Sequence, residues 1–270
     1  MDNNILYHYT SVDTFLKIFK EGTKNICLRA THAAYFNDPY EGKYTVELLE
    51  ESFRKYEEDN NIKERKQGMN QLVINFIHSA LGEPYLLSFS EHPDSLTMWR
   101  AYGDNGNGIA IGFDKYVIGS NPEEKPNVNL IDCLYDESKI KAILQTHWDK
   151  VYNNYKINEG KTSYHGSPIF PIYNKFYFGF KRKEYAIEAE WRLCQNVHST
   201  QTKKHRVSNG LIIPYVEHIF PQEAIKKIVL GPCLDPEKSK KSVADFAKYK
   251  GLHLNEETDI IISKVSYRNI

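Results

Sequence analysis

Two glutamates stand two positions apart in the segment 187–194, which alternates polar and apolar residues. Strand geometry would project Glu188 and Glu190 from one face, with Arg192 beside them and Trp191 toward the core. Carboxylates placed in this way can stabilise positive charge on a substrate or polarise an acceptor. An ion pair between Glu190 and Arg192 at a sheet edge is an equally good interpretation, because such pairs are common in folded proteins.

A histidine near the start of the chain is a second candidate. His8 lies in the aromatic run 7–10, and Thr10 would share its face of a strand. A histidine among aromatic residues is more often a hydrogen-bonded packing residue than a catalytic one. Both interpretations therefore stay open.

The stretch 84–114 concentrates polar and aromatic residues between two apolar runs. The first run is strand-like and ends at Ser90, a short helix begins near Leu96 and ends at Gly103, and a second strand starts at Ile109. Such a density of functional groups beside core strands exceeds what folding requires. The side chains that this corner would present together are Ser88, Ser90, Asp94, Trp99, Arg100 and Tyr102.

Composition excludes several classes of partner. The 270 residues include 35 basic and 35 acidic ones, so no global field favours a nucleic acid or an anionic membrane. Basic clusters at 181–183 and 203–206 leave a local nucleic-acid patch open, although such clusters are more often solvated loops. No window reaches the roughly 18 uninterrupted apolar residues of a membrane span. Four well-separated cysteines without C-x-x-C, and no signal-peptide pattern, favour a cytoplasmic location.

The sequence offers little for metal or nucleophile chemistry. The ten histidines are scattered and H-E-x-x-H is absent, so we expect no metal. Neither a P-loop nor a G-x-S-x-G motif occurs.

The elements that must position these residues follow from hydrophobic periodicity. Strands are expected near 5–10, 26–30, 85–90, 109–113, 130–135, 187–194, 211–216, 225–230 and 259–265. Helices are expected at 12–19 (with Ser11 as N-cap), 44–80 in two pieces, 96–102, 138–158 and 236–250. The segment 44–80 is highly charged, which indicates a peripheral helical layer, and the C-terminal strand, helix and strand form a βαβ-like unit. No boundary divides the chain, so we expect a single domain over 1–270.

Four motifs together resemble a bacterial family known as domain of unknown function 2971. They are LYHYT at 6–10, YFNDPYEG at 35–42, LSFS at 87–90 with MWRAYG at 98–103, and EAEWRL at 188–193. The resemblance covers nearly the whole chain, and the family name implies no activity.

A more distant similarity concerns mechanism. ADP-ribosyltransferases of the diphtheria-toxin and cholera-toxin types place a His or Arg on a first strand, a Tyr or Ser on a second and a Glu on a later one. His8, Ser88 and the pair Glu188 and Glu190 occur here in that order. The similarity implies an α+β fold with a mixed, largely antiparallel core sheet and peripheral helices. It also implies that NAD is the substrate.

The same similarity implies a role for each candidate residue. Glu190 would hold the ribose hydroxyls and stabilise the charge that builds on the sugar, while Glu188 would polarise the acceptor. Arg100 would meet the pyrophosphate. His8 and Thr10 would fix the adenosine ribose. The remaining residues expected to bind the nucleotide are Tyr9, Tyr35, Asn37, Asp38, Ser88, Ser90, Trp99, Tyr102 and Arg192.

The function implied is NAD-dependent ADP-ribosyl transfer or NAD cleavage, in a toxin or anti-phage role. A second class, a non-enzymatic sensor that binds a nucleotide or nucleic acid in the same aromatic cleft, stays open. A third is a nuclease-like hydrolase, which a dependence on divalent metal would favour.

Overall fold

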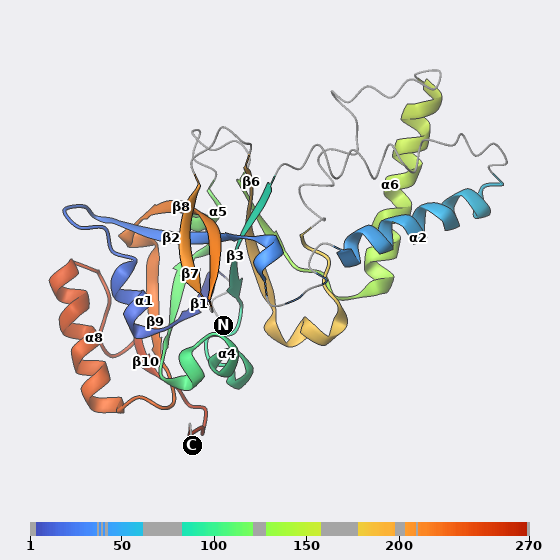
Figure 1. Ribbon diagram of the computed structural model, residues 1–270. Helices are drawn as coiled ribbons and strands as arrows, with labels where there is room; N and C mark the ends of the chain where they lie inside the picture. The colour runs from blue at the N-terminus through green and yellow to red at the C-terminus, as the bar shows by residue number, and fades with distance from the viewer. Residues whose placement is uncertain are drawn as a thin grey trace.

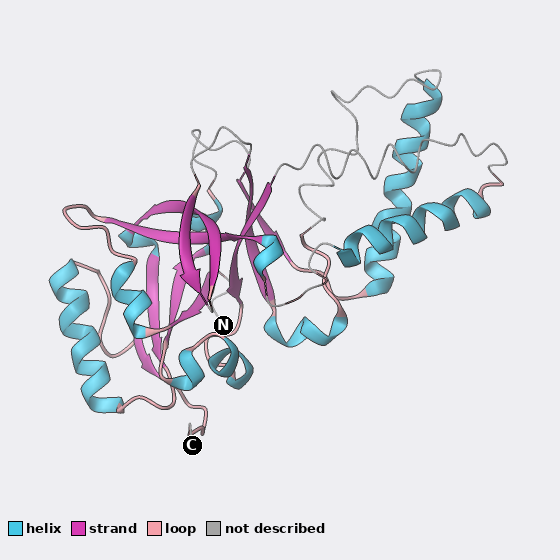
Figure 2. Cartoon of the chain, viewed as in Figure 1, coloured by secondary structure: helices cyan, strands magenta, loops and turns pink. Residues whose placement is uncertain are grey.

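The computed structural model describes residues 4–36, 38, 40, 43–61, 83–120, 128–157, 178–197, 203–208 and 210–268 (Figure 1). The protein is an α+β structure built on a mixed, mostly antiparallel open sheet, as the sequence predicted (Figure 2). The strands are β1 (Ile5–Thr10), β2 (Asn25–His32), β3 (Glu83–Ser90), β4 (Ile109–Asp114), β5 (Val128–Asp132), β6 (Glu190–Val197), β7 (Lys204–Ser208), β8 (Leu211–Pro221), β9 (Ile225–Leu230) and β10 (Ile260–Ile262).

The main path of the sheet runs β10-β9-β4-β1-β3-β2-β8-β7, and β6 pairs with both β3 and β5. The α-helices are α1 (Val12–Lys17), α2 (Lys43–Asp59), α4 (Leu96–Ala101), α5 (Lys115–Gly119), α6 (Glu137–Ile157) and α8 (Pro236–Lys250). Short 3-10 helices are η1 (Ala33–Tyr35), η2 (Asp104–Gly106), η3 (Lys183–Glu188) and η4 (Gln222–Ala224). No helix in the described ranges combines the length and the apolar character that a membrane crossing needs.

Alternating residues of β1 separate two cores on the two faces of the sheet. Leu6 packs with residues of α1 and α8 in the larger core. Tyr7 and Tyr9 pack on the other face against Met98 and Trp99 of α4. The period of two along β1 therefore assigns α1 and α4 to opposite sides of the sheet.

Several local predictions are confirmed. The Ser11 hydroxyl accepts a hydrogen bond from the Thr14 amide at 3.1 Å, which caps α1. Gly251 ends α8 in the left-handed conformation. Strands β9 and β10 flank α8 and pair in parallel, as the βαβ-like pattern indicated.

The sheet is split along β3. At one end of this strand Ser90 pairs with Tyr7 of β1, whereas at the other end Tyr85 and Leu86 pair with β2. Residues 87–89 of β3 lie between these two pairings, at the place where β1 and β2 diverge from each other. On its other side β3 pairs along its whole length with β6. The split leaves room for a cavity within the sheet.

The first helix of the predicted helical layer is present as α2. Its partner is α6, which lies far away in the sequence, and the two project together from the sheet (Figures 1 and 2). Tyr56 donates to Asp149 at 2.9 Å, and the Trp148 indole donates to Ser52 at 2.9 Å. The second helical piece expected before residue 80 lies outside the described residues.

Two strands differ from the sequence interpretation. Strand β6 begins at Glu190, so Glu188 precedes it as the last residue of η3. The basic cluster at 203–206 was expected to be a solvated loop, but most of it forms the edge strand β7. From His205 to Ser208 exposed and half-buried residues alternate, which is typical of an edge strand.

Candidate functional site

A cavity of about 540 Å³ opens at the split in the sheet. Its lining comes from both sides of the split and from helices on both faces, including Thr14 of α1 and Tyr102, which follows α4. Cavities of this size commonly hold small organic ligands. Its polar wall is formed by η3, β6 and the chain just before them.

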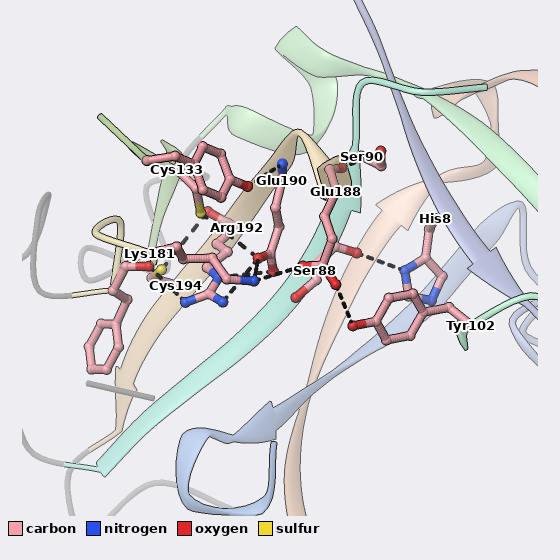
Figure 3. Close-up of polar contacts among 12 residues, drawn as sticks. His8, Ser88, Ser90, Tyr102, Cys133, Lys181, Glu188, Glu190, Arg192 and Cys194 are labelled. Atoms are coloured by element: carbon pink, nitrogen blue, oxygen red, sulfur yellow. Dashed lines mark hydrogen bonds and ion pairs between the residues drawn. The ribbon is translucent and has the colours of Figure 1, made fainter. Parts of the chain in front are cut away.

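A buried ionic cluster occupies that wall (Figure 3). Lys181 Nζ lies 2.7 Å from Glu188 Oε2 and 2.6 Å from Glu190 Oε2, so one ammonium group bridges both carboxylates. Arg192 holds Glu190 from the other side, through Nε to Oε1 at 2.9 Å and Nη2 to Oε2 at 3.0 Å. This forked contact is the strong geometry for an arginine and a carboxylate. The ion pair considered from the sequence therefore forms, with Lys181 as an additional member.

The electrostatics keep Glu190 and Lys181 ionised. Burial by itself would raise the pKa of Glu190, but Arg192 and Lys181 outweigh it and lower that pKa to about 2. Burial likewise opposes the charge of Lys181, but Glu190 and Glu188 outweigh it and its pKa is raised. At neutral pH both groups are charged.

The backbone around Ala189 brings the two carboxylates together. In a regular strand Glu188 and Glu190 would share a face, but here Ala189 adopts a left-handed conformation with φ 41° and ψ 55°. The chain around it is fixed because Ser90 Oγ donates to the Glu188 carbonyl at 2.6 Å and the Glu190 amide donates to Tyr135 Oη at 2.9 Å. The shared face predicted from spacing is thus produced by a turn.

Glu188 is held less completely than Glu190. Tyr102 Oη donates to Glu188 Oε1 at 2.9 Å, and Lys181 approaches the other oxygen. Burial, followed by the charge of Glu188, raises the pKa of Tyr102, so the phenol remains a proton donor. Each Glu188 oxygen thus has one partner and can accept a further hydrogen bond.

His8 lines the same cavity. Its Nδ1 lies 2.9 Å from the Ser88 carbonyl oxygen. Because a carbonyl can only accept, Nδ1 carries the proton and Nε2 carries the lone pair. Burial lowers the pKa of His8, the bond to Ser88 opposes this shift, and the charge of Arg206 adds to it. The imidazole is therefore neutral at pH 7 and has one free acceptor nitrogen.

Comparison with known proteins gives a match to a family model. Residues 98–193 match a family described as a protein of unknown function, DUF2971. The DUF2971 match includes Tyr102, Lys181, Glu188 and Glu190 but ends before Arg206. No curated protein matches the chain, and no solved structure matches it.

The cavity brings together many of the predicted residues, from inside and outside the DUF2971 match. Those that line it are His8, Tyr9, Thr10, Asp38, Ser88, Tyr102, Glu188, Glu190 and Arg192. Two of them are engaged elsewhere. Tyr9 Oη donates to the His92 carbonyl at 2.8 Å and accepts from the Ser95 amide at 3.2 Å, so it anchors the corner. Asp38 accepts from the Tyr40 amide at 2.9 Å and pairs with Arg182 at 3.5 Å.

Four predicted residues do not line the cavity. Trp99 is fully buried in the α4 core and donates to Asp94 at 2.7 Å, so its ring cannot stack on a base. Ser90 is also fully buried and positions Glu188. Arg100 is exposed on α4 and Tyr35 packs edge-on against His32, both away from the cavity lining. The position of Asn37 lies outside the described residues.

Three basic residues were missed. Lys181 was assigned to a surface cluster, yet it is buried. The aromatic run at 176–180 just before it is a signal of burial that sequence reasoning could have used. Arg29 and Arg206 also line the cavity. Arg206 belongs to the basic cluster at 203–206, which was assigned to a solvated loop, whereas Arg29 is an isolated arginine on a strand and carries no local signal of this kind.

Proposed function

We propose that this cavity binds NAD and cleaves the bond between nicotinamide and ribose, passing ADP-ribose to water or to an acceptor. The observation that carries the proposal is the Glu188 carboxyl group, which is fixed by Tyr102 and Lys181 and is able to accept another hydrogen bond in the cavity. Cleavage of a glycosidic bond builds positive charge on the sugar carbon. A fixed carboxylate in a water-poor site stabilises that charge.

An ADP-ribosyltransferase-like arrangement gives this proposal further support. His8, Ser88 and Glu188 come from widely separated parts of the chain, and all three line one cavity in a mixed sheet. His8 Nε2 accepts a hydrogen bond from a ribose hydroxyl, and its neutral state avoids repelling the nicotinamide cation. These roles follow the order of residues that the sequence similarity implies.

The two carboxylates exchange the roles that the sequence comparison implied. Glu190 is neutralised by Arg192 and Lys181, so it has little charge left to offer a substrate. We therefore assign the stabilisation of the ribose cation to Glu188. Glu190 is a positioning residue that holds Lys181 against Glu188.

A nicotinamide-release assay tests the proposal. Incubation with NAD is followed by quantification of nicotinamide and by mass spectrometry of the products. The Glu188→Gln variant keeps the shape of the side chain but removes its charge, and we expect release to fall by about 100-fold or more. Glu184→Gln, an exposed change on the same short helix, is the matched control and should release nicotinamide like the wild type.

Each other outcome has a clear reading. Equal release by wild type and Glu188→Gln would refute the role of Glu188. Binding of NAD without any release would favour a nucleotide sensor, which the bridging of Glu188 by Lys181 also allows. Loss of activity in EDTA would favour a metal-dependent hydrolase.

A further inference from the structure

One face of β2, β8 and β7 delivers basic side chains to the cavity wall. Strand β8 pairs with both neighbours, and Tyr215 stands opposite Thr31 on one side and Lys204 on the other. Residues two positions along a strand share its face, so Arg29 joins Thr31 and Arg206 joins Lys204. Arg29, Thr31 and Arg206 all line the cavity.

The contacts of Arg206 leave part of its guanidinium unused. Its Nη2 donates to Thr31 Oγ1 at 2.9 Å. Its Nε is buried and has no acceptor among the described residues. A buried donor without an acceptor is costly, and each one in a folded protein calls for an explanation such as a missing ligand.

The charges of Arg29 and Arg206 are only partly balanced, since after Lys204 the charge of Arg29 also helps to lower the pKa of Glu217. The Arg29 guanidinium lies over the Tyr215 ring at 4.8 Å, and within the described ranges neither arginine forms an ion pair. Glu217, opposite Arg29 in register, is paired with Lys204 at 2.7 Å. Burial and then the charge of Arg29 lower the pKa of Arg206, so the two cations repel each other.

The other cations that line the cavity are all paired. Lys17 binds Asp13, Lys181 bridges two glutamates, and Arg192 holds Glu190. The cavity thus has one balanced wall and one wall whose two guanidinium groups form no ion pair among the described residues. A ligand that complements both walls carries a multiply charged anion at the arginine end.

We propose that Arg29 and Arg206 form a diphosphate-binding subsite and take the pyrophosphate of a nucleotide ligand. Guanidinium forks match phosphate oxygens with two parallel hydrogen bonds. The subsite deepens the proposed function and rests on it only for the identity of the ligand. It orients NAD with its phosphates at Arg29 and Arg206 and its glycosidic bond at Glu188.

Calorimetric titration with ADP and with adenosine tests this subsite without any turnover. We expect the wild type to bind ADP at least about tenfold more tightly than adenosine, and added salt to reduce the difference. Arg29→Gln and Arg206→Gln should each weaken ADP binding by about tenfold or more, with adenosine binding unchanged. Lys241→Gln removes a positive charge from α8, which contributes nothing to the cavity lining, and should bind ADP like the wild type.

The possible failures are distinguishable. Equal affinity for ADP and adenosine, or normal ADP binding by both arginine variants, would overturn the subsite even if NAD is cleaved. Arginine-dependent ADP binding without nicotinamide release would keep the subsite and remove the proposed cleavage. Arg29 is exposed, so its variant should fold even if Arg206→Gln does not, and circular dichroism checks both.

Discussion

The cavity has two charged walls of opposite design. On the wall formed by η3 and β6, Lys181, Glu188, Glu190 and Arg192 satisfy one another at distances of 2.6 to 3.0 Å. On the wall formed by β2 and β7, Arg29 and Arg206 face the cavity, and neither forms an ion pair with another described residue. The first wall balances its charges without a ligand, although each Glu188 oxygen can still accept one hydrogen bond, whereas the arginines of the second wall gain an anionic partner from a ligand. A charged side chain in a cavity is therefore not by itself evidence of ligand binding. A charged side chain whose charge or hydrogen bonds are incompletely paired is better evidence.

The largest expected effect comes from breaking the complete wall. Arg192→Met removes the fork that holds Glu190 and leaves a buried carboxylate with Lys181 as its main partner. Removing one member of a buried pair costs about 3–5 kcal/mol, and we expect a loss of this size in the free energy of unfolding measured in urea. Arg182→Gln, which affects a more exposed pair with Asp38, should change it far less. Similar losses for the two variants would contradict the idea that the buried contact of Arg192 stabilises the fold more than an exposed pair does.

The stability that Glu190 contributes to this wall should decrease gradually as the pH falls. The folded pKa of Glu190 is about 2, below its usual 4.5, so its contribution to stability is present above pH 4.5 and is lost as the pH falls toward 2. The shift corresponds to stabilisation on the order of 3 kcal/mol. The free energies of unfolding of wild type and Glu190→Gln should therefore differ most near neutral pH and converge in acid. A difference that stays constant from pH 6 to 2 would show that the charge of Glu190 contributes nothing.

The smallest effect is expected on the incomplete wall. Arg29→Gln gives up a contact with the Tyr215 ring but relieves repulsion with Arg206. The lost ring contact and the relieved repulsion oppose each other. Because Arg29 is exposed, we expect the free energy of unfolding, measured by thermal denaturation, to change by no more than about 0.5 kcal/mol. A large loss of stability would mean that Arg29 has a structural role, and the contrast between the walls would then fail.

Sequence reasoning reached the elements and several of the side chains that meet. Periodicity predicted β1, β3 and β4, and spacing placed Glu190 with Arg192. It could not predict the left-handed Ala189, because that conformation is held by contacts with residues far away in the chain. It also missed Lys181. The burial of this residue depends on Glu188 and Glu190, which the turn at Ala189 brings together. The prediction that Trp99 binds the nucleotide failed for a related reason. The sequence of an aromatic residue in a polar corner does not show whether its ring faces a ligand or the core.

The divergence of β1 and β2 along β3 has a consequence for how this molecule can change. The opening is a slot in the peptide framework, with side chains from α1 on one face and from the end of α4 on the other. The width of this opening depends on the point at which β1 and β2 diverge. Replacing a residue at its rim therefore changes the side chains that line the cavity but does not close it. Closing the cavity would require β1 and β2 to form new pairings with β3. A shift of one residue in the register of a strand would move all of its inward-facing side chains to the outer face.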